Sequence, residues 1–112
     1  MSTARSNGRR DAYSERIRRL LRDKYLPRHP RAEFAVYRAS PANVHIRILD
    51  PDFRGVDIPE RDDMAWEVLD GLPDEVVSDI SVVLLLPPEE RDAYQLSREF
   101  DTAPRSRAKK NA

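Results

Sequence analysis

Three features of the sequence predict an α+β fold. Apolar residues recur at helical spacing between Tyr13 and Tyr25, alternate with polar residues from Val44 to Leu49, and run almost uninterrupted from Ile80 to Leu86. These patterns are typical of a surface helix, a half-buried strand and a strand buried on both faces, respectively. At 112 residues the chain can form one modest core. We therefore expect one domain with a three-stranded mixed sheet, in the order helix, strand, strand, helix, short turn, strand, and with the helices on one face of the sheet.

The first helix is expected to begin at Asp11 or Ser14, because either side chain can act as an N-cap. It should end near Leu26, because Pro27 disfavours helical backbone at the residue before it. Apolar residues at helical spacing give it an inward face. The opposite face carries four arginines, Arg16, Arg18, Arg19 and Arg22.

A hairpin is predicted next. Residues 33–37 alternate as a half-buried strand, residues 40–43 form a turn, and the return strand is Val44–Leu49. Because successive side chains of a strand point to opposite faces, His45 and Arg47 should face solvent while their neighbours face the core.

The second helix is expected to start at Asp57, with Pro59 in its first turn and Glu60 three residues after the cap. Gly71 and Pro73 should end it. Its inner face carries Ala65, Val68, Leu69 and Leu72, with Met64 and Trp66 beside them.

The strand Ile80–Leu86 follows a short helical turn within residues 73–79. The strand, helix, strand unit from Val44 to Leu86 favours a crossover between parallel neighbours. Residues 87–90 should stop the last strand and begin a short helix through Leu96. The polar segments 1–11 and 99–112 are predicted to be disordered basic tails around a folded domain of residues 12–98.

Charge is unevenly distributed along a chain whose net charge is zero. Residues 1–31 carry ten basic and three acidic side chains, residues 32–101 six and seventeen, and residues 102–112 four and none. The sequence thus predicts a basic first helix and basic tails around an acidic body.

Several classes of protein are excluded or disfavoured. The chain has no cysteine, which excludes disulfides, thiolate-bound metals and cysteine nucleophiles. The N-terminal arginines are followed by no apolar run before Ile17, and Val82–Leu86 is too short to cross a bilayer. We therefore expect a soluble cytoplasmic protein of bacterial type, with no role in a membrane.

Other candidate chemistry has simpler interpretations. Asp50, Asp52 and Asp57 offer oxygen ligands for a hard cation, but their spacing is not that of a calcium loop, and turn and cap roles are preferred. His29 and His45 are expected to be surface histidines, because no nucleophile or carboxylate accompanies either at a recognisable spacing.

The element order and several short motifs resemble the BolA family, whose fold is related to type II KH domains. The resemblance covers about residues 12–91. The residues that carry it are Phe53, Gly55, Arg61, Trp66, Leu69, Pro88 and Glu89. Residues 50–90 also resemble small uncharacterised bacterial proteins.

In BolA proteins a histidine after the arginine shares a [2Fe–2S] cluster with a monothiol glutaredoxin. Here Asp62 stands at that place, and the second family ligand would fall near Asn43. His45 lies two residues further on, at a strand position that is ordinarily not a ligand. We therefore expect no cofactor, and the resemblance does not favour a glutaredoxin partner.

The leading hypothesis is a non-enzymatic adaptor of BolA-like fold that binds a protein partner, with Arg61 and Trp66 as candidate contacts. The alternative is a nucleic-acid-binding accessory protein that uses the arginine face and the tails. Against it stand the absence of a Gly-x-x-Gly loop, the few aromatics and the acidic body. A third interpretation leaves that face solvated or paired with acidic residues of the same chain or of a second copy in a homodimer.

Overall fold

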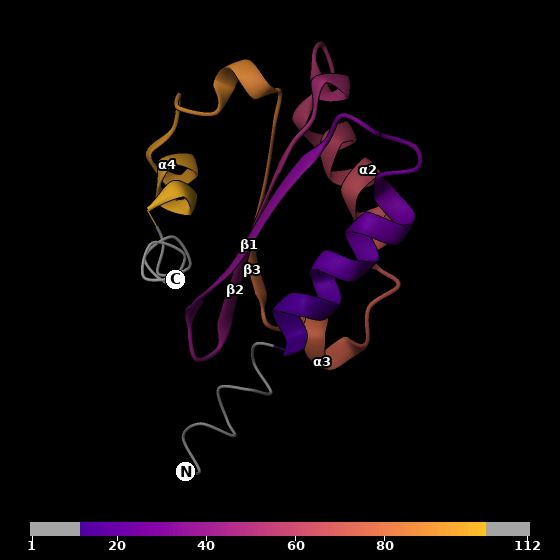
Figure 1. Ribbon diagram of the computed structural model, residues 1–112, viewed down its shortest axis with the longest axis vertical. Helices are drawn as coiled ribbons and strands as arrows, with labels where there is room; N and C mark the ends of the chain where they lie inside the picture. Colours follow the sequence, from indigo (N-terminus) through magenta and orange to yellow (C-terminus); the bar gives the residue numbers. More distant parts are fainter. Residues whose placement is uncertain (1–11, 103–112) are drawn as a thin grey trace.

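The computed structural model describes residues 12–102, in which three strands form one sheet in the order β1-β2-β3 (Figure 1). β1 (Glu33–Ser40) pairs antiparallel with β2 (Asn43–Leu49), and β2 pairs parallel with β3 (Ile80–Leu86). The predicted fold class, the hairpin and the crossover between parallel neighbours are confirmed.

The first helix is α-helical over residues 12–20 and continues as one π-helical turn, η1 (Leu21–Tyr25). The N–H group of Leu26 donates to the carbonyl of Leu21 at 3.0 Å, five residues back. Ile17, Leu21 and Tyr25 are buried and lie four residues apart. Because an α-helix repeats every 3.6 residues, the wider turn keeps the third of these residues on the buried face.

After β2, the 3-10 turn η2 (Pro51–Phe53) leads into α2 (Ile58–Leu69) and then the short α3 (Asp74–Val77). Gly55 adopts φ +73°, a conformation that side-chain-bearing residues rarely adopt. Asp57 occupies the N-cap position of α2, but its side chain makes no capping hydrogen bond, so the predicted side-chain cap is wrong.

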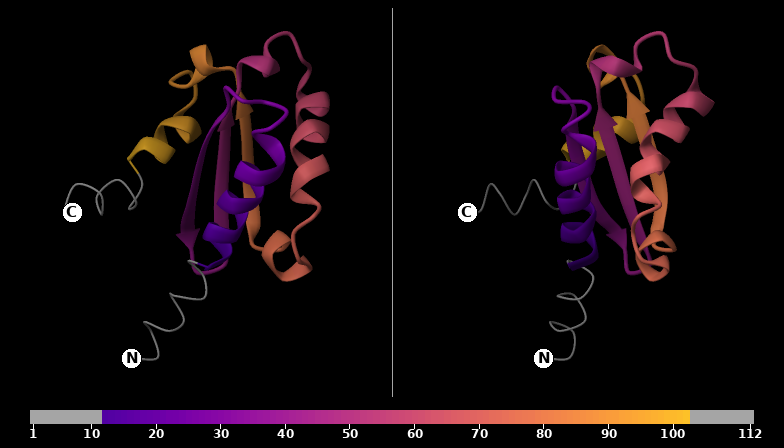
Figure 2. Two further views of the ribbon diagram at one scale, coloured as in Figure 1. Left: turned by 45° about the vertical axis from the view of Figure 1, so that its right-hand side comes forward. Right: turned by 90° about the vertical axis from the view of Figure 1, so that its right-hand side faces the viewer.

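The first helix and α2 lie side by side over one face of the sheet, which we call the core face (Figure 2). Apolar side chains from both helices and all three strands meet there. The buried cluster includes Ile17, Leu21, Val36, Ile46, Ile48, Phe53, Ala65, Leu69 and Leu85. The two predicted helices therefore do cover one face.

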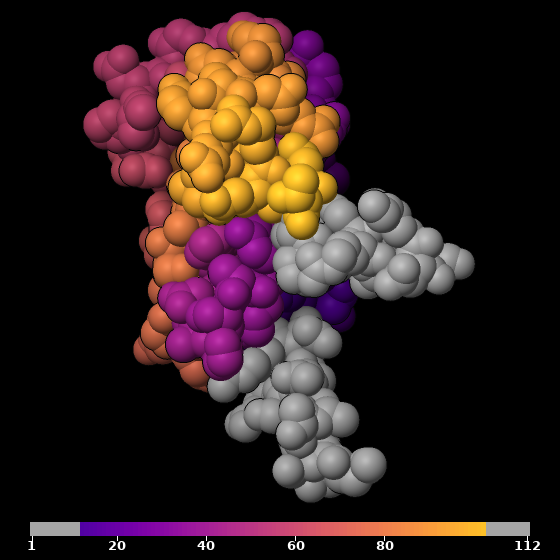
Figure 3. Space-filling model, turned by 90° about the vertical axis from the view of Figure 1, so that its left-hand side faces the viewer, coloured from indigo at the N-terminus to yellow at the C-terminus, as the bar shows by residue number. Residues whose placement is uncertain are grey.

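The opposite face, here called the far face, is covered by a helix that lies further along the chain than predicted. After the 3-10 turn η3 (Pro88–Glu90), α4 (Gln95–Asp101) begins where the predicted helix was to end. Figure 3 shows this C-terminal segment over part of the molecule, with the β1–β2 hairpin uncovered beneath it. Phe100 is fully buried, so the fold extends past the predicted domain end at residue 98. The predicted tail 1–11, and residues 103–112 of the predicted tail 99–112, lie outside the described residues.

Two strand predictions are wrong because burial on a strand depends on which elements lie beside it. Arg47 was expected in solvent, but its side chain is only 4% exposed because α4 covers it. β3 was expected to be buried on both faces, yet only its last two residues are buried. Among the described strands β3 lies at the edge of the sheet, so no further strand shields its outer side.

Candidate functional site

The four arginines of the first helix do not act as one set. Arg16, Arg19 and Arg22 are exposed, as predicted. Arg18 is instead held by hydrogen bonds within the protein: its Nη2 donates to the carbonyl of Val36 at 2.7 Å, and its Nη1 donates to Glu15 at 2.9 Å. Arg18 therefore fastens the helix to β1.

A groove runs between the first helix and α2, and we call it the interhelical groove. Two adjoining hollows of about 240 and 370 Å³ share Leu20, Lys24 and Gly71. Arg16 and Arg19 line the first hollow, and Arg28 lines the second, where it pairs with Glu67 at 3.4 Å. Within residues 12–102, Arg16, Arg19 and Lys24 have no carboxylate within 4.0 Å. The groove thus presents cations that can bind an acidic ligand.

A second groove, which we call the edge groove, lies along the C-terminal half of β3. It has a volume of about 200 Å³. The exposed side chains of Ile58, at the start of α2, and Tyr94, just before α4, flank it; they are 66% and 50% exposed. The other lining residues are Arg61, Asp62, Val83, Leu84, Leu85 and Leu86. Exposed apolar side chains beside the open edge of a strand are typical of an interaction site.

Arg61 and Trp66, the predicted contacts on α2, have different positions. Arg61 lies in the edge groove, where its Nε donates to the carbonyl of Val56 at 2.8 Å and its Nη1 to that of Leu85 at 3.0 Å. Trp66 is partly buried against the core and is not among the residues lining either groove. Arg61 thus shapes the groove by binding backbone, whereas Trp66 mainly packs.

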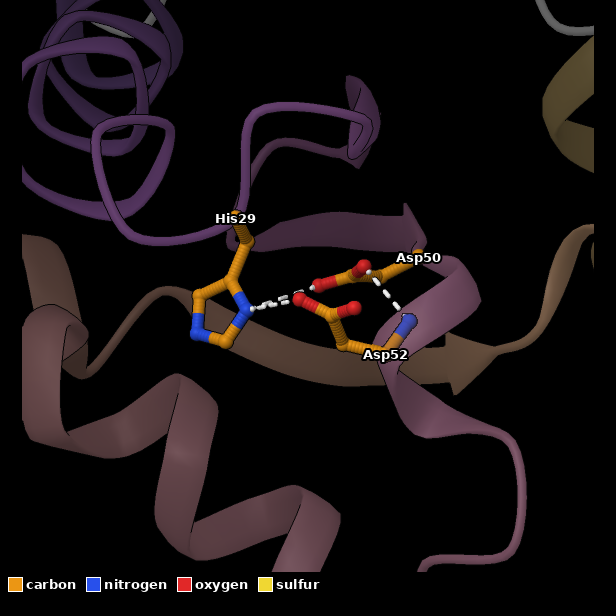
Figure 4. A group of neighbouring side chains, drawn as sticks. All are labelled: His29, Asp50 and Asp52. Carbon is orange, nitrogen blue, oxygen red and sulfur yellow. Dashed lines mark hydrogen bonds and ion pairs between the residues drawn. The ribbon is translucent and has the colours of Figure 1, made fainter.

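His29, Asp50 and Asp52 converge at the end of β2, and Figure 4 shows the three side chains facing one another. His29 Nδ1 lies 2.7 Å from Asp52 Oδ2 and 3.4 Å from Asp50 Oδ2. Asp50 is fully buried, accepts from the hydroxyl of Tyr25 at 2.7 Å, and also accepts from the N–H of Asp52 at 2.9 Å. His29 stacks on Tyr25, so its prediction as a surface histidine is wrong.

This cluster is the one group of the described residues whose ligand atoms, within 4.8 Å of one another, could hold a metal ion. Asp57, the third predicted oxygen ligand, is not part of it. Each of its three side chains already has a hydrogen-bond partner in the protein. Burial and the Asp50 carboxylate raise the pKa of Tyr25 well above its usual range, which keeps its hydroxyl a donor. The cluster is therefore explained as the joint between the first helix and the end of β2.

A second buried polar group lies under α4. Arg47 donates from Nη1 to the carbonyl of Ser97 at 2.7 Å and from Nη2 to Asp101 at 3.0 Å, and its guanidinium lies over the ring of Phe100. Hydrogen bonds from Arg47, and then from Arg91, lower the pKa of Asp101 to about 2. His45 is also covered here; burial lowers its pKa, and its Nδ1 lies 3.0 Å from the hydroxyl of Tyr37.

Ile58 and Tyr94 are the edge-groove residues that sequence reasoning missed. Ile58 stands between Asp57 and Pro59, and Tyr94 between Ala93 and Gln95, so no periodic pattern marks either residue. The positions where the BolA family's cluster ligands would fall are Asn43 and Asp62; Asn43 donates to the hydroxyl of Ser40, and Asp62 is exposed in the edge groove. No helix in residues 12–102 is long and apolar enough to cross a membrane.

Comparison with known proteins found no matching family model, no matching curated protein and no matching solved structure. Membership of the BolA family therefore stays a prediction from short motifs.

Proposed function

We propose that this protein is a non-enzymatic interaction module that binds a protein partner at the edge groove. The observation that carries the proposal is that the open edge of β3 lies beside Ile58 and Tyr94, whose large apolar side chains are exposed to solvent. Burying such side chains at an interface is favourable in proportion to the apolar area removed from water. These two residues replace Trp66, one of the two predicted contacts, as the proposed anchors, while the other, Arg61, lines the groove and binds the Leu85 carbonyl.

The test compares two double variants in capture of partners from a lysate of the source organism after nuclease treatment. Ile58→Ser with Tyr94→Ser removes both exposed apolar side chains of the edge groove, and Ser at position 94 suits the N-cap of α4. Arg16→Ala with Arg19→Ala is the matched control on the other groove. We expect a specific protein that the control retains and the edge-groove variant loses. Equal capture by both variants would contradict the proposal.

A second candidate function, nucleic-acid binding, has its own observation: Arg16, Arg19 and Lys24 line the interhelical groove without carboxylate partners in the described part of the chain. Phosphate contacts make log affinity fall with log salt at a slope near −0.7 per contact for single strands. We expect Arg16→Ala with Arg19→Ala to flatten that slope for a single-stranded homopolymer, and the Ile58 and Tyr94 variant to leave it unchanged. If the slope does not change in the arginine variant, this second function is wrong.

A further inference from the structure

We propose that the partner binds the edge groove as an added β-strand, through an extended apolar segment that is flanked by Lys or Arg. This inference rests on the proposed function and names the chemistry of the partner. It is carried by three independent features of the groove: the backbone of β3, the two walls beside it, and the charge around it.

The backbone of β3 has an edge available for pairing. The carbonyl of Leu86 accepts from the N–H of Asp50 at 3.0 Å, so the backbone groups of Leu86 point toward the β2 side. Because alternate residues of a strand direct these groups to opposite edges, those of Val83 and Leu85 point outward. The bond from Arg61 to the Leu85 carbonyl, made from outside the sheet, agrees with this direction. An incoming strand can pair with Val83 on both of its backbone groups and with the N–H of Leu85.

β3 also lacks the usual protection of an edge strand. Its seven residues contain no charged side chain and no proline, and Ser81 is the one polar residue among them. By contrast, the other edge strand, β1, carries Glu33 and Arg38. The β2–β3 pair does have a register shift, where Val44 pairs with Ile80 and His45 with Val82, but Val83–Leu86 pair with β2 in continuous register. Charged side chains prevent edge-to-edge pairing. Among the described strands, β3 therefore has the less protected edge.

The walls of the groove match the alternation of a strand. Ile58 belongs to α2 on the core face and Tyr94 to the segment leading to α4 on the far face. A strand added in the plane of the sheet directs successive side chains to opposite faces. Its apolar side chains would alternately contact Ile58 and Tyr94, which explains why one exposed apolar residue stands on each side.

The charge near the groove selects the flanks of the partner. Glu60, Asp62 and Asp63 on α2 are exposed, and none of them pairs with a basic side chain among the described residues. Basic residues beside the apolar segment would complement these carboxylates.

The same charges disfavour a second copy of this chain as the occupant. Two β3 strands paired antiparallel would bring the exposed Asp62 and Asp63 of one copy toward the start of β3 in the other, where Asp74 and Glu75 are also exposed. Like charges placed together across an interface oppose association. The geometry therefore favours a partner of another sequence.

The test uses a synthetic peptide with a short core of consecutive Val residues, so that both faces of the added strand are apolar, and with Lys at both ends; it is titrated into the full chain by calorimetry. Two control peptides have the same core: one carries Glu in place of Lys, and the other is N-methylated at alternate residues to block one backbone edge. We expect both controls to bind at least about tenfold more weakly than the Lys peptide, a difference well resolved by titration. Bound Lys peptide should also slow amide hydrogen exchange at Val83 and Leu85. Glu60→Lys with Asp62→Lys should reverse the preference between the Lys and Glu peptides.

The outcomes separate this inference from the proposed function. If the N-methylated peptide binds as well as the parent, or if the lysate partner depends on Ile58 and Tyr94 while no peptide binds, strand addition is wrong and docking at the groove stands. If capture does not depend on Ile58 and Tyr94, the proposed function is wrong. A concentration-dependent dimer in sedimentation that Ile58→Ser with Tyr94→Ser abolishes would make the occupant a second copy and overturn the inference.

Discussion

The two faces of the sheet are covered in physically different ways. On the core face, two helices bury an apolar cluster that includes Leu21, Ile46 and Leu69. On the far face, the seven-residue α4 covers the sheet through Phe100 and through the bonds from Arg47 to Ser97 and Asp101. The helices on the core face are thus held by many non-directional apolar contacts, whereas α4 on the far face is held by one aromatic side chain and a few directional hydrogen bonds.

This difference locates the weak side of the fold. α4 is short, and an isolated helix of that length is not stable in water, so its position depends on its contacts with the sheet. Those contacts involve β1 and β2, whereas Val82 and Leu84 of β3 are only partly buried. We therefore expect the core face to set the global stability and the far face to set the order of α4.

The largest effect should come from the core face. Leu69→Ala removes a fully buried side chain from α2 and should lower the free energy of unfolding by about 2–5 kcal/mol, because the cavity it leaves cannot fully close. Urea unfolding followed by the fluorescence of Trp66, the single tryptophan of the sequence, measures it.

Glu67→Ala is the matched control on the same helix. Glu67 is exposed and its pair with Arg28 is long, so the loss should stay within about 0.5 kcal/mol. A comparable loss in both variants would mean that α2 itself, and not its buried face, limits stability.

A smaller and asymmetric effect is expected on the far face. Asp101→Ala leaves the buried Arg47 without its carboxylate and should cost about 1–3 kcal/mol. Arg47→Met should cost less, because Asp101 is 31% exposed to water and keeps Arg91 at 2.9 Å. Urea unfolding of the two single variants and the double variant measures both losses and their coupling. A larger loss for Arg47→Met would show that the far face is held by packing around Arg47 and not by the ion pair.

The sequence predicts the core face well because apolar periodicity reports which side of a helix or strand is buried. Ile17 and Leu21 on the first helix, and Ile46 and Ile48 on β2, follow directly from their spacing. The far face could not be predicted in the same way. Arg47 alternates as a solvent-facing residue does, and its partner Asp101 lies 54 residues away, beyond any local pattern. A seven-residue helix with one fully buried aromatic also gives too short a signal to distinguish it from a tail.

The candidate sites were predicted only in part for a related reason. Helical spacing identified Arg16, Arg19 and Arg22 as exposed cations. The bond from Arg18 to the Val36 carbonyl could not be predicted in this way, because it depends on how the first helix packs on β1. The edge groove depends on β3 lying at the sheet edge and on two exposed residues 36 positions apart in sequence, Ile58 and Tyr94. Strand order is a tertiary property, so an apolar run such as Ile80–Leu86 fits a central strand and an edge strand equally well.

The smallest effect should be a pH dependence confined to the far face. The pKa of Asp101 is lowered to about 2 in the folded protein, from an ordinary value of 3.8. A lowered pKa means that the stabilisation is fully present above the ordinary value and is lost as pH falls from about 4 through 2. Wild type should therefore exceed Asp101→Asn in unfolding free energy at pH 5, and the difference should shrink steadily toward pH 2. Amide hydrogen exchange in α4 over the same range should rise in wild type more than in the variant, while exchange in α2 changes equally in both. A difference between the two proteins that does not depend on pH would mean that the Asp101 side chain acts by its shape and hydrogen bonds, and that its charge does not hold α4 on the sheet.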